Sequence, residues 1–114
     1  MGLRAKEIVL GLDAQKAYER LKENHDHESL SIVRRVKSLE LILLADCQYG
    51  EVVKKGRIPT PLRLKHGLEN LYVCDLPSYW RLLYTIVRVG NKPSIVVVEV
   101  VNHDTYNKWF PSHR

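Results

Sequence analysis

Three residues in the last third of this chain have side chains suited to acting on a phosphate ester. Arg81 stands near the start of a β-rich run, and His103 and Tyr106 follow the next such run. An arginine guanidinium can hold a phosphate through two hydrogen bonds and stabilise charge that develops in a transition state. Histidine can move a proton near neutral pH, and tyrosine can orient or donate one. With an RNA 2′-hydroxyl as nucleophile, this set could cleave a phosphodiester without a metal ion.

Structural roles offer an alternative explanation for the same residues. Arg81 could pair with Asp75 or Glu99 on neighbouring strands, where opposite charges attract across a sheet. His103 and Tyr106 could simply cap and pack a terminal helix. The residue types therefore give a hypothesis of catalysis, but their spacing alone does not distinguish catalysis from a structural role.

A second group of candidate residues is cationic. No acidic residue lies between Glu51 and Glu69, and a basic cluster of this kind suits a phosphate backbone. The predicted nucleic-acid contacts are Lys54, Lys55, Arg57, Arg63 and Lys65. The formal charge of +5 for the whole chain points the same way, toward a polyanionic partner. A solvated basic loop without a ligand is the alternative.

Metal and thiol chemistry are not expected from this sequence. His25 and His27 flank Asp26, but no third and fourth ligand stands nearby, so this segment is predicted to be a polar connector. Cys47 and Cys74 are too few for a disulfide framework or a metal cage, and reduced thiols in a cytoplasmic protein are the simplest expectation. We predict no metal site and no cofactor.

Length and composition indicate one ordinary globular domain spanning residues 1–114. The chain has 45% hydrophobic and 27% charged residues, which is typical of a water-soluble protein. No apolar run approaches the roughly 18 residues that a membrane span needs, and the N-terminus lacks the pattern of a secretory signal. A cytoplasmic protein without a membrane partner is therefore predicted.

Three β-rich runs must position the candidate residues. Residues 71–76, 80–89 and 94–101 show the alternation or the β-branched content of strands. The turn signals Leu76-Pro77-Ser78-Tyr79 and Gly90-Asn91-Lys92-Pro93 separate them. This arrangement predicts a three-stranded antiparallel meander.

The two faces of this meander differ in character. Tyr72, Leu82 and Tyr84 fall on an apolar face that other elements must cover. Asp75 and Arg81 fall on the opposite face, which is predicted to be open to solvent. We expect any function on that second face.

Helices are predicted in the first half and at the end of the chain. A short strand over 6–10 precedes helices over 14–23 and 29–45, and a short helix is expected over 102–110. Residues 46–60 show only turn signals and are predicted to form a loop with room for a short helical or extended piece. The stripe that should cover the apolar sheet face is Ile32, Val36, Leu39 and Leu43.

The order of these segments resembles the RelE/ParE superfamily of toxin–antitoxin toxins, and RelE-like members in particular. Two helices precede Leu71–Leu76, then Trp80-Arg81-Leu82-Leu83-Tyr84, an apolar strand and His103-Asp104-Thr105-Tyr106. The close similarity covers roughly the last third of the chain. The resemblance implies an α+β fold, with two N-terminal helices packed on a twisted antiparallel β-sheet and a short C-terminal helix.

The resemblance also implies an activity and a partner. RelE-like toxins are ribosome-dependent mRNA endoribonucleases (mRNA interferases) that inhibit translation and are neutralised by a cognate antitoxin protein. They cut mRNA in the ribosomal A site by attack of the 2′-hydroxyl, without a cofactor. By position, Arg81 would steady the scissile phosphate, His103 would be an acid, a base or a phosphate contact, and Tyr106 would align the substrate.

The sequence departs from the RelE-like pattern in one predicted strand. Val73 and Asp75 stand where RelE-type toxins often carry outward basic residues, which leaves the general base unassigned. Lys65 or His66 could replace it. The departure favours an alternative, a RelE-fold module that binds protein or nucleic acid without catalysis. A ParE-like inhibitor of DNA gyrase is a third alternative, which the histidine–tyrosine pair after the last strand disfavours.

Overall fold

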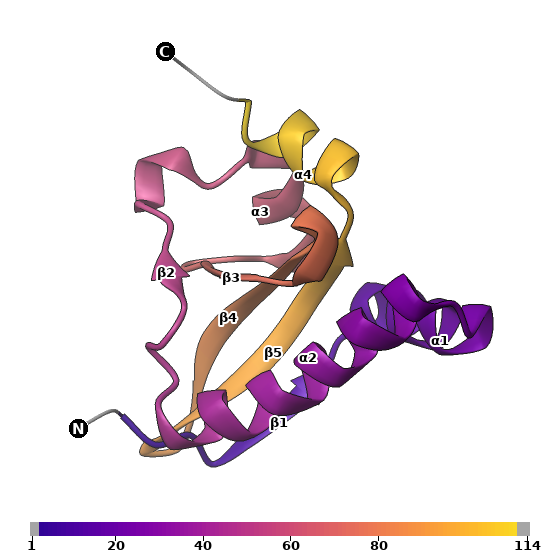
Figure 1. Ribbon diagram of the computed structural model, residues 1–114. Coiled ribbons are helices and arrows are strands. Elements are labelled where there is room, and N and C mark those ends of the chain that lie inside the picture. The colour runs from indigo at the N-terminus through magenta and orange to yellow at the C-terminus, as the bar shows by residue number, and fades with distance from the viewer. Residues whose placement is uncertain (1–2, 112–114) are drawn as a thin grey trace.

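A five-stranded mixed sheet forms the centre of the fold (Figure 1). The computed structural model describes residues 3–111. Within that range the strand order is β1-β5-β4-β3-β2. The strands are β1 (Glu7–Leu10), β2 (Glu51–Val52), β3 (Tyr72–Asp75), β4 (Arg81–Val89) and β5 (Lys92–Val101).

Helices lie on both faces of this sheet, so the chain has an α+β fold (Figure 1). The α-helices are α1 (Leu12–Asn24), α2 (His27–Ala45), α3 (Thr60–His66) and α4 (His103–Trp109), and the short 3₁₀ turns are η1 (Lys55–Arg57) and η2 (Pro77–Tyr79). The short C-terminal helix is confirmed, and the Asn102 side chain caps it by accepting a hydrogen bond from the Thr105 N–H at 2.9 Å. None of the helices in the described range is both long enough and apolar enough to cross a membrane.

The predicted meander of β3, β4 and β5 is confirmed. Both strand pairs are antiparallel, and Arg81 lies opposite Asp75 on one side and Val101 on the other. A register shift interrupts the β4–β5 pairing between Leu83 and Tyr84.

The expectation of a wholly antiparallel sheet is wrong at one edge. β1 pairs in parallel with β5, from Glu7 opposite Ser94 to Leu10 opposite Val97. A hydrogen bond of 2.8 Å from the Gly11 N–H to the Val97 carbonyl continues this pairing to the start of α1. The two strands are far apart in sequence, and local patterns do not set their relative direction.

The apolar face of the meander is covered as predicted. The stripe Ile32, Val36, Leu39 and Leu43 of α2 shares one buried core with Leu82 and Tyr84, and Tyr72 packs against its edge. Tyr84 also fixes the chain that follows α2. Its hydroxyl donates to the Cys47 carbonyl at 2.7 Å and accepts from the Gly50 N–H at 3.0 Å. This pair of bonds sets where β2 begins.

The opposite face is not open to solvent along its length, contrary to the expectation. A second core covers it, made of Ile58, Leu62, Leu68, Leu71, Val73, Leu83 and Val98. The unexpected helix α3 supplies Leu62. Pro61 lies in the first turn of α3, where a missing N–H removes no helical hydrogen bond. Gly67 then ends the helix with φ of 63°, a conformation that glycine adopts without strain.

Truncation of Leu82 to alanine tests the first core. Leu82 is 1% exposed between β3 and β5, so the free energy of unfolding should fall by roughly 2–5 kcal/mol in urea titrations. Leu64 is the matched control because it is 74% exposed on α3, and Leu64→Ala should change stability by less than about 0.5 kcal/mol. Equal losses in the two variants would contradict the arrangement of the core.

Candidate functional site

Arg81 begins β4 at the end of the sheet where β5 leads into α4. Its Nε lies 3.2 Å from Oδ1 of Asp75 in an ion pair, and its Nη1 donates to the Trp80 carbonyl at 3.1 Å. The Arg81 side chain is 20% exposed, whereas that of Asp75 is 86% exposed. The guanidinium is therefore fixed within the structure, while its carboxylate partner lies in water.

Tyr106 of α4 forms the second wall around this guanidinium. Arg81 Cζ lies 5.0 Å from the centroid of the Tyr106 ring, within the range of a cation–π interaction. The ring also stacks on Phe110 with centroids 4.7 Å apart. Because residues at positions i and i+4 share a helix face, α4 and its C-cap residue Phe110 present a double aromatic surface beside Arg81.

The environment of Tyr106 raises the pKa of its phenol. Burial is the main cause, the neighbouring Arg81 cation acts in the opposite direction, and the carboxylates of Glu51 and Asp75 raise the pKa further. The phenol consequently stays protonated at neutral pH. It can donate a hydrogen bond or a proton to an anion at this place.

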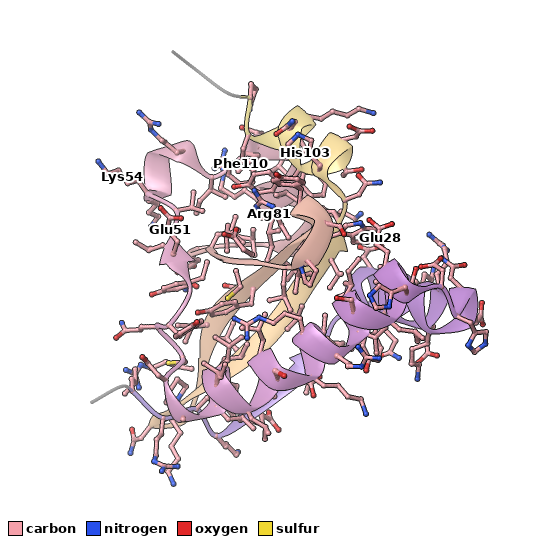
Figure 2. The ribbon with its side chains drawn as sticks, in the orientation of Figure 1. Glu28, Glu51, Lys54, Arg81, His103 and Phe110 are labelled. Atoms are coloured by element: carbon pink, nitrogen blue, oxygen red, sulfur yellow. The ribbon has the colours of Figure 1, made fainter. Side chains whose placement is uncertain are left out.

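A hollow of about 340 Å³ is lined by Tyr106 and by residues of the segment around β2. Figure 2 labels three of its lining residues, Glu51 and Lys54 on that segment and Phe110 after α4. Val52, Val53 and Val73 provide apolar walls, Tyr106 and Phe110 provide aromatic ones, and Glu51, Lys54 and Arg57 provide charges. Tyr106 connects the two parts of the site because its ring both lines the hollow and contacts Arg81.

The structure does not place His103 in contact with the Arg81 guanidinium. It starts α4 at the same end of the sheet, but its ring lies against Tyr79 with centroids 5.7 Å apart. Its Nε2 is 2.9 Å from Nδ2 of Asn107. Within residues 3–111, no hydrogen bond or ring contact joins His103 to Arg81 or Tyr106.

The five predicted nucleic-acid contacts fall into three groups. Lys54 and Arg57 line the hollow, and Lys55 lies beside them, exposed in η1. Arg63 is exposed on α3. Lys65 differs from the others because its ammonium is 3.1 Å from Asp13 and 3.6 Å from Glu99. Its charge is already paired within the protein.

Glu51 is the site residue that sequence reasoning missed. It is exposed in β2, lines the hollow with Tyr106, and contributes to the raised pKa of the phenol. The sequence contained one signal, since Glu51 is one of the two acidic residues that bound the acid-free interval. Its approach to Tyr106 depends on the pairing of β2 with β3, which the sequence did not predict.

In comparisons with known proteins, no family model, no curated protein and no solved structure matches this chain.

The titration of Tyr106 tests this geometry without any assumption about function. Since Arg81 holds the phenol pKa down, Arg81→Gln should raise that pKa, and Glu51→Gln should lower it. NMR of ring-labelled tyrosine measures both shifts. Tyr84, whose pKa is also raised by burial but without Arg81 among the causes, is the internal control. A Tyr106 pKa that is the same in wild type and Arg81→Gln would show that the cation does not contact the ring.

Proposed function

We propose that this protein is a RelE-like endoribonuclease that cleaves mRNA on the ribosome without a metal ion and is neutralised by an antitoxin protein. One observation carries the proposal. A guanidinium is held on an aromatic ring beside a hollow that contains two further cations, Lys54 and Arg57. This combination fits one nucleotide and its phosphates, and the order of segments that resembles RelE-like toxins supports the same reading.

The hollow suits one base of single-stranded RNA together with its flanking phosphates. Its volume of about 340 Å³ falls at the lower end of the range of roughly 300–1,000 Å³ for ligand pockets. Bases of single-stranded RNA stack on aromatic side chains, and Tyr106 and Phe110 provide such surfaces. Lys54 and Arg57 can neutralise flanking phosphates.

The reaction we propose at this site is an internal transfer of the phosphoryl group. The 2′-oxygen attacks phosphorus while the bond from phosphorus to the 5′-oxygen breaks, which gives a 2′,3′-cyclic phosphate and a 5′-hydroxyl. The Glu51 carboxylate accepts the proton of the 2′-hydroxyl, and the Tyr106 phenol donates a proton to the departing 5′-oxygen. Arg81 stabilises the negative charge gained by the other phosphate oxygens.

A second candidate function, RNA binding without cleavage, is favoured by Asp75. Its carboxylate pairs with Arg81 Nε at 3.2 Å, and a carboxylate beside a scissile phosphate repels the charge that the reaction gathers. The pair is mostly exposed on the Asp75 side, so Asp75 can be displaced at modest cost. A protein that binds RNA and leaves it intact would support this second function.

Arg81→Ala tests the proposed catalysis. Loss of the guanidinium should lower ribosome-dependent mRNA cleavage by roughly 10²–10³-fold, because stabilisation of the transition-state charge is removed. Cleavage is measured by mapping 3′ ends, and growth is followed on induction. Arg88→Ala is the matched control, since Arg88 is exposed near the other end of β4 and its guanidinium donates to the Asn91 carbonyl. Wild-type protein that neither cuts mRNA nor slows growth would refute the enzymatic function.

Substitution of Lys54 and Arg57 by glutamine tests the RNA interface. Each lost phosphate contact should reduce the slope of log K against log salt by about 0.7 for single-stranded RNA, as measured by fluorescence anisotropy at several salt concentrations. Lys65→Gln is the contrasting variant, because the Lys65 charge is paired with Asp13 and Glu99, and its slope should equal that of wild type. An unchanged slope in the Lys54/Arg57 variant would assign these two cations to a solvated surface.

A further inference from the structure

A separate polar cluster lies where α1, α3 and β5 meet, and the proposed reaction does not use it. Its centre is Glu99, a carboxylate that is only 6% exposed. His66 Nε2 lies 2.8 Å from Glu99 Oε2, and the Lys65 ammonium lies 3.6 Å from the same oxygen. Asp13, in the first turn of α1, approaches Lys65 at 3.1 Å.

The cluster holds a cation between two carboxylates that are distant in sequence. Asp13, His66 and Glu99 each offer one possible ligand atom, and the three atoms lie within 4.8 Å of one another. The ammonium of Lys65 pairs with both carboxylates. With His66 neutral, one ammonium against two carboxylates leaves one net negative charge, and a buried carboxylate is stable only when it is compensated.

We propose that Asp13, His66 and Glu99 form a binding site for a divalent transition metal, Zn²⁺ in the first place, and that Lys65 is the internal cation which the metal displaces. Imidazole nitrogen and carboxylate oxygen together are a donor set for Zn²⁺, whereas Mg²⁺ prefers oxygen ligands alone. Three protein ligands leave the fourth tetrahedral position to water. The double positive charge of Zn²⁺, in place of the single charge of the Lys65 ammonium, would neutralise the two carboxylates.

Small movements convert the observed arrangement into a tetrahedral site. Ligand atoms at 2.0–2.2 Å from Zn²⁺ lie about 3.4 Å from one another. The His66–Glu99 distance of 2.8 Å must therefore open by roughly 0.6 Å. Asp13 and Lys65 are partly exposed side chains that can change rotamer. Nε2 of His66, which contacts Glu99, can bind a metal only in the tautomer that carries its proton on Nδ1.

Zinc titration of the untagged chain, residues 1–114, tests the proposal. Isothermal calorimetry should show one Zn²⁺ bound per chain, with no comparable binding of Mg²⁺, and the midpoint of thermal unfolding should rise with Zn²⁺. Lys65→Met removes the competing ammonium and should bind Zn²⁺ at least 10-fold more tightly than wild type. In the Lys65→Met background, His66→Gln should weaken binding at least 10-fold.

A control separates this site from the other histidines. His25→Gln with His27→Gln replaces the C-cap residue of α1 and the first residue of α2, which the structure places in the helix rather than in the predicted connector, and should leave Zn²⁺ affinity unchanged. The proposal is overturned if Lys65→Met binds Zn²⁺ no more tightly than wild type, if His66→Gln leaves binding intact, or if the His25/His27 variant abolishes it. None of these outcomes depends on RNA cleavage, so the metal site and the proposed ribonuclease function can fail independently.

Discussion

Burial of the β4–β5 pair on both faces is the constraint on which the rest of the structure depends. Leu82 and Tyr84 enter the core beneath α1 and α2, while Leu83 and Val98 enter the core beneath α3. Alternation along the strand then places Arg81 on the α3 side, just beyond the last fully buried position. Its guanidinium is thus covered by protein yet close to solvent. An arginine in this position has a fixed orientation as well as its charge, whereas a surface arginine keeps its charge but not one orientation.

Local patterns in the sequence predicted the elements that depend on short-range periodicity. The alternation of 71–76 and 80–89 and the helical stripe of 29–45 gave the meander and the helix layer that covers it. Helix α3 was missed because proline and several cations dominate its composition, and Leu62 is its only buried residue. The parallel pairing of β1 with β5 joins segments separated by most of the chain, and no local signal specifies it.

In the candidate site, too, some contacts could be predicted from local patterns and others depend on tertiary packing. The proximity of Arg81 and Tyr106 followed from strand parity and from the short path between β5 and α4, both of which can be read locally. The contact of His103 with Tyr79 depends on η2, where Ser78 and Tyr79 both adopt positive φ. Likewise, the pairing of Lys65 with Asp13 and Glu99 requires α3 to lie over β5. Tertiary packing, which cannot be read from local sequence patterns, therefore determines which charged side chains remain available to bind a ligand.

The Arg81 cluster and the Glu99 cluster differ in how exposed their acidic residue is, and this difference determines what each cluster can bind. Asp75 is almost fully solvated, and an ion pair of that kind contributes about 0–1 kcal/mol, so a phosphate with two anionic contacts can replace it on Arg81. Glu99 is buried, and removal of its partners without a substitute would leave an uncompensated charge. The first cluster can therefore exchange its anion for a ligand, whereas the second can exchange its cation only for another cation. For this reason the proposed substrate site is the Arg81 cluster, and the proposed metal site is the Glu99 cluster.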